Sequence, residues 1–352
     1  MLFRSQRADE IEAACRRAVA DLVGGEPGGV ILGPNMTTLT YRLAGTMARD
    51  WAAGDEVVVS RLDHDANVRP WVQFAARRGV TVRWAEADVS TGELPAAQYD
   101  ELIGPRTRLV AVTAASNVLG TRPDVAAITA KARAAGALSY VDGVHATAHG
   151  PVDMAALGAD FYATSAYKWS GPHVGAVVAD PRLLRGQRPD RLASQSDLVP
   201  YRFERGTPPF ADLAGVTAAT EHLAGLDGPA AGSRRARLLA SMAAAERHEL
   251  QLFAALTDGL ASMRHVTLYG RACRRTATAF FTVAGRTPQQ AAARLAERKI
   301  NVWDGHNYAW EVTGAMGIRD SGSAVRAGLV HYNDASDVDR LLTAVADLGG
   351  PR

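Results

Sequence analysis

Two alternating patterns of apolar residues run through the first 180 residues, one typical of amphipathic helices and one of buried strands. Residues 6–23 place Ile11, Ala14, Cys15, Ala18 and Leu22 on one helical face, so Cys15 is expected in a packed core. Apolar strand-like runs follow at 30–32, 56–60, 80–84, 108–112, 138–141, 160–164 and 174–179, with helical patterns at 37–51, 67–78 and 124–135. This alternation predicts an α/β fold whose mainly parallel sheet is covered on both faces.

A second, smaller unit is predicted near the C-terminus. A Pro- and Arg-rich irregular stretch at 181–209 and a helix at 211–224 lead to the Gly-rich break GLDGPAAGS, the best candidate boundary. Beyond it we expect helices at 234–263, 288–298 and 335–348 and short strands at 266–268 and 277–283. The prediction is a large α/β domain at 1–228 and a small α+β domain at 229–352.

Composition and charge narrow the function classes for this chain of 352 residues. A formal net charge of +2 gives no global attraction to nucleic acid or to an anionic membrane. The chain has two cysteines, Cys15 and Cys273, and neither lies in a zinc- or cluster-binding motif, so no metal and no disulfide framework are expected. The N-terminus lacks an apolar signal core and no stretch is long enough for a membrane span, which points to a reducing cytoplasm.

Lysine is rare: the chain has only Lys131, Lys168 and Lys299. Lys131 and Lys299 lie on Ala-rich helical stretches, where an exposed charge is ordinary, whereas Lys168 lies between two strands in DFYATSAYKWSGPHVGAVV. A buried lysine tends toward the neutral, nucleophilic form, which makes imines with carbonyl groups. An exposed lysine reaching solvent from a loop is an equally good interpretation of this segment alone.

Two further strand ends carry polar residues, where ligands bind to open parallel sheets. The run VILGPNMTTLT predicts a strand followed by a helix start, whose free N–H groups and hydroxyls suit a phosphate, although an ordinary capped turn is the commoner explanation of this segment alone. In LSYVDGVHATAHG, Asp142 ends a strand and could hold a protonated heterocyclic nitrogen, or be a simple turn residue. His145 and His149 lack a third ligand for a metal, so a capping or stacking role is expected.

In chain order, a phosphate turn, a strand-end acid and a lysine 26 residues later describe a pyridoxal 5'-phosphate (PLP) site. A nicotinamide-dependent dehydrogenase is a poorer interpretation, because the GxGxxG turn is missing and Tyr167 and Lys168 are adjacent rather than spaced as YxxxK. The run from VDGVHATAHG to YKWSGPHVGAVV resembles the class V aminotransferases, in the branch of cysteine desulfurase-like proteins. VSRLDHDANVRPW, VTAASNVLGT, YRFERGTPPF, WDGHNYA and VRAGLVHYNDASDVDRL extend the resemblance over 30–342.

The resemblance implies the fold of type I PLP enzymes, a homodimer, an amino acid or amine substrate and a role for each matching residue. Lys168 would bond covalently to PLP, Asp142 would pair with the ring nitrogen, and His145 would lie near the phenolic oxygen. Asn117 and Arg326 would hold the substrate carboxylate; without the family, Arg326 suggests an ordinary surface arginine. The phosphate would meet Asn35, Met36, Thr37, Ser165, Tyr167 where relatives often have His, and Thr207 from a second subunit.

Three departures from the family pattern restrict the expected function. Tyr308, a candidate substrate-contacting residue, stands where desulfurases carry a mobile catalytic cysteine, so an enzyme persulfide is not expected. Ala114 replaces the aromatic residue that usually stacks on the PLP ring, so another side chain covers the ring or the ring is held more loosely. Relatives also carry some tens of residues before the helix that begins near Gln6, so the chain is a truncated form or its pocket is more open.

The expected activity is therefore that of a desulfurase-like lyase or an aminotransferase. The sequence does not choose between transamination, elimination and epimerisation. A protein that retains the fold without catalysis is the alternative.

Overall fold

A computed structural model describes residues 2–228 and 231–349 and confirms the α/β architecture. The main sheet has seven strands in the order β1-β7-β6-β5-β4-β2-β3. Strands β6, β5, β4, β2 and β3 run parallel to one another, whereas β7 is antiparallel to both β1 and β6. Its strands are β1 (Val30–Gly33), β2 (Glu56–Ser60), β3 (Thr81–Ala85), β4 (Thr107–Thr113), β5 (Leu138–Asp142), β6 (Phe161–Ser165) and β7 (Gly175–Ala179).

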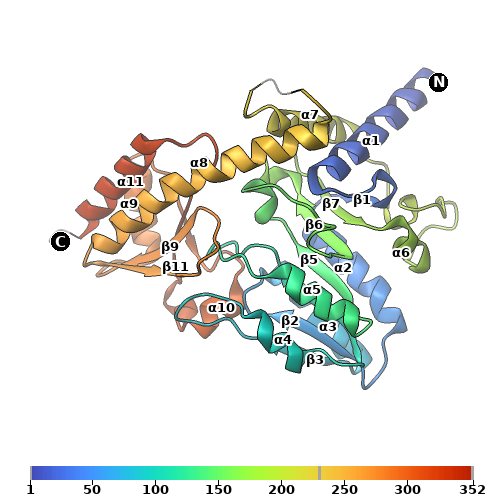
Figure 1. Ribbon diagram of the computed structural model, residues 1–352, viewed down its shortest axis with the longest axis horizontal. Coiled ribbons are helices and arrows are strands. Elements are labelled where there is room, and N and C mark those ends of the chain that lie inside the picture. The colour runs from blue at the N-terminus through green and yellow to red at the C-terminus, as the bar shows by residue number, and fades with distance from the viewer. Residues whose placement is uncertain (1, 229–230, 350–352) are drawn as a thin grey trace.

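Helices cover both faces of this sheet (Figure 1). One apolar core lies between the sheet and α2 (Met36–Met47) and α3 (Arg69–Arg78). The opposite core is closed by α1 (Leu2–Val23), α5 (Val125–Ala134), α7 (Phe210–Ala224) and the first half of α8 (Arg234–Ser262). Central strands such as β2, with the sequence EVVVS, are buried along their whole length, because helices remove water from both faces.

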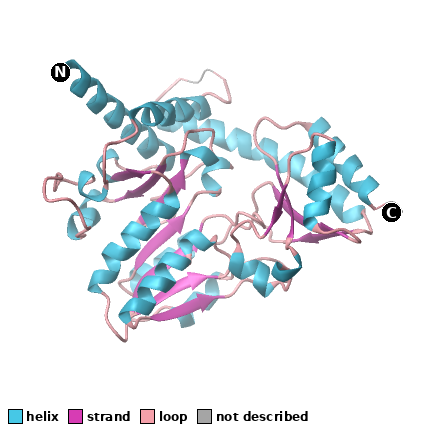
Figure 2. Ribbon diagram, turned by 180° about the vertical axis from the view of Figure 1, so that it is seen from behind, coloured by secondary structure: helices cyan, strands magenta, loops and turns pink. Residues whose placement is uncertain are grey.

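A second, four-stranded sheet lies toward the C-terminus, apart from the first one (Figure 2). It is antiparallel, in the order β10-β11-β9-β8, with β8 (Val266–Tyr269), β9 (Thr278–Val283), β10 (Trp303–Gly305) and β11 (Ala324–Gly328). Helices α9 (Pro288–Glu297) and α11 (Ala335–Leu348) and the second half of α8 pack on it. Because α8 contributes Met242 to the first core and Leu256 to the second, it joins the two units; the boundary at 228/229 stays a prediction.

The periodic patterns place the long elements well and miss the short ones. The structure adds α4 (Tyr99–Leu102), α6 (Pro181–Gly186), α10 (Trp310–Ala315), β10 and β11. Segments of three to six residues contain too few positions to show a period, and β10 and β11 are identified as strands by their pairing alone.

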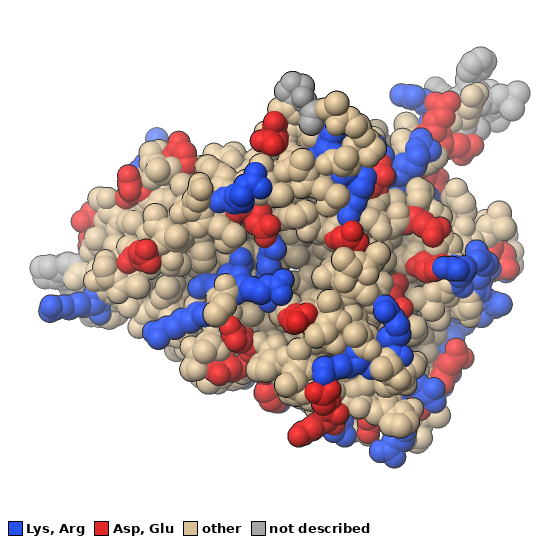
Figure 3. Space-filling view, viewed as in Figure 1, with Lys and Arg blue, Asp and Glu red and all other residues tan. Residues whose placement is uncertain are grey.

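Cys15 is fully buried, as expected, and Cys273 is exposed. No helix in 2–228 or 231–349 is long and apolar enough to span a membrane, and these residues contain no metal-ligating cluster. Charges of both signs are interspersed over the face shown in Figure 3.

Candidate active site

A pocket of about 970 Å³ opens where the carboxyl ends of the parallel strands meet. The ends of β4, β5 and β6 contribute Thr113, Asp142 and Ser165, and β11 of the C-terminal unit contributes Arg326. The sequence-predicted residues that line it are Asn35, Met36, Thr37, Asn117, Asp142, His145, Ser165, Tyr167, Lys168, Tyr308 and Arg326. The fold thus brings together residues up to about 290 positions apart, leaving Thr207 outside.

Lys168 lies in a short 3-10 turn (Ala166–Lys168) that follows β6 directly. Of the two interpretations of this segment, the exposed lysine is confirmed, because this turn directs the side chain into the pocket, where it is exposed. The pocket walls still remove enough water to lower the pKa of Lys168, and the nearby Arg326 lowers it further, whereas Asp142 acts in the opposite direction. The lysine is therefore shifted toward the neutral amine that carbonyl chemistry requires.

Asp142 ends β5 and is almost completely buried. Its Oδ1 accepts a hydrogen bond of 2.9 Å from Val144 N. Burial raises its pKa to about 6, while that hydrogen bond and the charge of Lys168 favour the ionised form. A protonated ring nitrogen beside this carboxylate would complete its neutralisation.

A second buried acid, which sequence reasoning missed, lies in the loop after β2. Asp63 is fully buried and accepts hydrogen bonds from Ser60 Oγ, from Asn67 Nδ2 at 2.6 Å and from the Thr113 backbone. Burial raises its pKa to about 7, and Asp142 adds to the shift. No spacing in the sequence pairs residues 63 and 142. The sheet brings them to the same edge, at the ends of β2 and β5 on either side of β4.

The turn between β1 and α2 forms one wall of the pocket. Asn35 caps α2, its side chain accepting a 2.8 Å hydrogen bond from Thr38 N, and Met36 N donates to Ser165 Oγ at 3.0 Å. A Cβ on Gly175 would lie 2.2 Å from the Asn35 backbone, so only glycine lets β7 approach this turn. The capped-turn and phosphate interpretations are thus both compatible with this structure, because the capped helix start also lines the pocket.

Tyr167, at the position where relatives often have His, packs its ring on that of His173. The ring centroids are 4.7 Å apart and the planes are nearly parallel. Both residues line the pocket. His173 belongs to the apolar, Gly-rich neighbourhood of Lys168 in the sequence, but its position against Tyr167 comes from the fold.

Asn117 and Arg326 form a polar corner with unfilled hydrogen-bonding capacity. Arg326 Nη1 donates to the Asn117 carbonyl at 3.1 Å, and Asn117 Nδ2 donates to the Asn307 carbonyl at 2.7 Å. Asn117 Oδ1 is buried without a hydrogen-bond partner in the described chain, and no carboxylate among those residues pairs with Arg326. Burial lowers the pKa of Arg326. A guanidinium in this position, rather than on the open surface, suits a bound carboxylate.

The pocket mouth is aromatic on one side. Tyr308 is 67% exposed, and its ring lies 5.3 Å from that of His64, a lining residue not identified from the sequence. Asn307 and Tyr308 both have left-handed backbone angles (φ +49° and +59°), an arrangement that is costly for non-glycine residues. Ala114 does not line the pocket, whereas His64 supplies an imidazole ring there.

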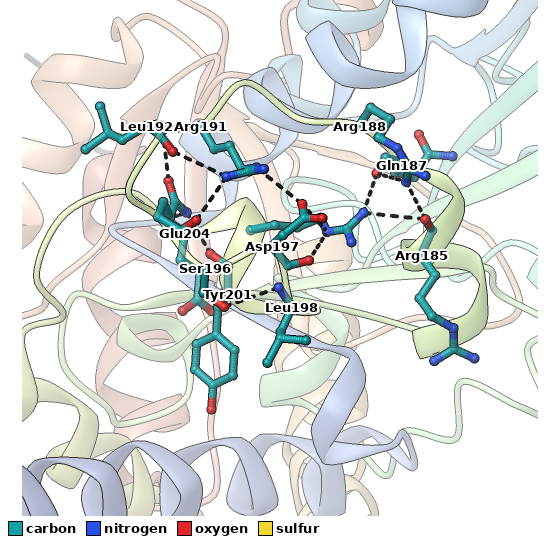
Figure 4. Close-up of polar contacts among 12 residues, drawn as sticks. Arg185, Gln187, Arg188, Arg191, Leu192, Ser196, Asp197, Leu198, Tyr201 and Glu204 are labelled. Carbon is teal, nitrogen blue, oxygen red and sulfur yellow. Dashed lines mark hydrogen bonds and ion pairs between the residues drawn. The ribbon is translucent and has the colours of Figure 1, made fainter.

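Thr207 is exposed and lies away from the pocket of its own chain. The segment before it folds on its own polar contacts (Figure 4): Gln195 Nε2 donates to the Tyr201 carbonyl at 2.7 Å and Arg202 Nε to the Asp197 carbonyl at 2.8 Å. This local fold leaves Thr207 at the surface before α7. Its contribution from a second subunit stays a prediction.

His145 joins the two units at the pocket floor. Its Nε2 lies 3.0 Å from the hydroxyls of both Thr276 and Thr278, and its ring lies 4.5 Å from that of His149. The two rings are in contact but are tilted by 57°, and the His145 side chain caps no turn, so neither stacking nor capping describes the role of His145. Burial holds the pKa of His145 well below its ordinary value, and His149, Arg326, Lys168 and Arg122 add to the effect.

Comparisons with known proteins agree with this geometry. A family model described as aminotransferase class V matches residues 2–341. The chain is 39% identical to the uncharacterized protein MT3887 of Mycobacterium tuberculosis, over 98% of this chain and 86% of that protein. It is 36% identical to a probable cysteine desulfurase of Pseudomonas putida, over 83% and 71%. The crystal structure of the cysteine desulfurase CsdA from Escherichia coli superimposes with a TM-score of 0.86 and 28% identity, over 97% and 84%.

The residues present fit the cofactor of this family. The α2 start and Ser165 suit the phosphate, Asp142 suits the ring nitrogen, and Lys168 is the amine beside them. The unsatisfied Asn117 Oδ1 and the carboxylate-free Arg326 leave room for a further polar ligand. The chain therefore belongs to the class V aminotransferase family and is a PLP-dependent enzyme with the fold of the cysteine desulfurases.

Proposed function

We propose that this enzyme acts on an α-amino acid or a related amine by lyase or aminotransferase chemistry, without forming a persulfide on a cysteine of its own. The observation that carries the proposal is that Lys168, Asp142 and Arg326 line one pocket. These groups supply an amine with a lowered pKa, an acid for a ring nitrogen and a guanidinium for a carboxylate.

Each residue has a definable task in this proposal. Arg326 binds the substrate carboxylate, and the Asn117 backbone carbonyl orients the guanidinium. Asn117 Oδ1 is an acceptor for an N–H group of the ligand. Asp142 holds a proton at the ring nitrogen. PLP, when bound, stabilises negative charge that develops at the amine-bearing carbon. Lys168 Nζ accepts the proton removed from that carbon and returns it elsewhere.

The cysteines support the absence of a persulfide step. Cys15 is fully buried on α1, and burial raises its pKa to about 12, which suppresses the reactive thiolate. Cys273 is exposed but does not line the pocket. The family resemblance puts Tyr308 where desulfurases carry their catalytic cysteine. A Cys15→Ala/Cys273→Ala variant should retain the activity of the wild type. Loss of a sulfur-transfer activity on removal of both thiols, with restoration by one of them, would overturn this part.

Borohydride reduction followed by peptide mass spectrometry is the direct test of the site. We expect the added cofactor mass on Lys168, and none on Lys131 or Lys299, which serve as internal controls. Titration with L-amino acids should then change the cofactor absorbance and give product in the wild type. Lys168→Ala should bind the amine without giving product, because the group that accepts the proton is missing. A labelled lysine without any amine-induced spectral change would support a non-catalytic binding protein instead.

The second subunit is part of the proposal. A homodimer in which Thr207 of one chain reaches the phosphate of the other is expected from the family pattern and supported by the exposure of Thr207. Light scattering of the PLP-loaded protein tests it. A monomer with full cofactor occupancy would remove Thr207 from the site.

A further inference from the structure

A buried carboxylate lies behind the pocket, outside the residues assigned so far. Glu249 is in the middle of α8 and is 1% exposed. Its Oε2 lies 2.7 Å from His149 Nδ1, and its Oε1 is buried with no hydrogen-bond partner in residues 2–228 and 231–349. In the same residues, no arginine or lysine forms an ion pair with it. A half-satisfied buried carboxylate is costly, so it needs an explanation beyond packing.

A neighbouring acid on the same helix provides a contrast. Glu246, about one turn earlier, is partly exposed and pairs with Arg122 at 2.5 Å. The same arginine donates to the His149 carbonyl at 3.0 Å. The available guanidinium therefore goes to Glu246, and the partner of Glu249 is the imidazole of His149.

The imidazole connects Glu249 to the pocket. His149 is 5% exposed, and its ring contacts that of His145, which lines the pocket beside Asp142 and Lys168. His145 is also held by the hydroxyls of Thr276 and Thr278. A continuous row thus runs from Glu249 through His149 and His145 to the reacting groups, and it crosses from the C-terminal unit to the large one.

The charges around this row are mostly positive. Arg122, Arg326 and Lys168 all disfavour a proton on His145, as does His149. On the other side of Glu249 lies His331, whose pKa is lowered by burial and by His222, His149 and His248, whereas Glu249 opposes the shift. Glu249 is the buried acid placed to offset this positive field.

We propose that Glu249 is a positioning residue of the active site, which acts through His149 to fix the ring of His145 and to offset the positive charge at the pocket floor. The inference rests on the proposed function only in taking this pocket as the place where the amine reacts. The hydrogen bond orients His149, because a carboxylate accepts the proton of Nδ1 and so selects that tautomer. The ring contact then limits the positions available to His145.

Two variants separate the charge from the hydrogen bond. Glu249→Gln keeps an oxygen that can accept from His149 and removes the negative charge, whereas Glu249→Leu removes both. Glu246→Gln is the matched control, since it removes a partly exposed, solvent-screened charge from the same helix.

Two measurements test the proposal in the PLP-loaded protein. Nitrogen-15 NMR of labelled histidine should show the proton of His149 on Nδ1 in the wild type and in Glu249→Gln. The pH midpoint of the cofactor absorbance should fall by roughly half a unit or more in Glu249→Gln, because loss of a negative charge disfavours protonated forms, and by less in Glu246→Gln. Glu249→Leu should lower kcat roughly tenfold or more with little change in KM.

Several results would contradict the proposal. A wild-type His149 protonated on Nε2 alone would refute the orienting role, whether or not Glu249→Leu folds. An unchanged pH midpoint in Glu249→Gln would refute the charge role, and a lowered thermal midpoint as the sole effect would make Glu249 a structural residue. If no amine alters the spectrum of any of these proteins, the proposed function fails, whereas the NMR result still decides the role of Glu249.

Discussion

The buried Asp63 makes the fold less stable as the pH rises, and Asp63→Asn should remove that dependence. Asp63 has no exposed surface, and burial raises its pKa from 3.8 to about 7. The folded state therefore binds the proton more tightly than the unfolded chain does. Stability is highest below the unfolded pKa and is lost as the pH rises through the folded one.

The size of the effect follows from the two pKa values. A shift of about three units corresponds to roughly 4 kcal/mol of lost stability once Asp63 is ionised in both states. Between about pH 5 and about pH 8 the linkage relation gives a loss of roughly 2.5 kcal/mol. The amide introduced by Asp63→Asn does not titrate, so the unfolding free energy of this variant minus that of the wild type should rise by the same amount over this range.

Urea unfolding of both proteins at each pH measures this difference. The changed hydrogen bonds with Ser60 and Asn67 add the same amount to the difference at every pH, so they do not affect how it changes with pH. Asp55→Asn is the control: its pKa is lowered by hydrogen bonds from Ala52 and Arg108, so the residue is ionised in both states over this range. Its difference from the wild type should be flat. A flat difference for Asp63→Asn as well would refute the reasoning.

Two further variants test the ligand contacts. Arg326→Lys should raise KM for an amino acid roughly 10- to 100-fold, the equivalent of about 1.5–3 kcal/mol for a lost charge-assisted hydrogen bond. An amine without a carboxylate should react with this variant as it does with the wild type. Equal effects on the two substrates would show that Arg326 does not contact the carboxylate. Gly175→Ala should weaken PLP binding roughly tenfold or more in a fluorescence titration, because its Cβ would meet the turn before α2, whereas Gly186→Ala, with open space around it, should bind as the wild type does. Equal affinities in the two glycine variants would contradict the close approach.

Contacts between residues far apart in the sequence are the part of the site that sequence patterns predict least. Lys168, Asp142 and the α2 start each follow an apolar strand, so their meeting at one sheet edge could be predicted. Arg326, 209 residues from Asn117, could be assigned through the family resemblance and not by a local pattern. The pairing of His149 with Glu249, 100 residues apart, and the approach of Asp63 to Asp142 had no signal at all.

Two kinds of information are thus distinguishable in this protein. The sequence by itself determined the α/β alternation, the positions of long elements such as β2 and α11, and the buried Cys15, because hydrophobic periodicity is a local signal. Tertiary structure alone decided that Lys168 is exposed in its pocket, that β10 and β11 pair, and that Glu249 reaches His149. Exposure, strand pairing and pKa depend on which distant segments exclude water from a group, and that is settled only when the whole chain has packed.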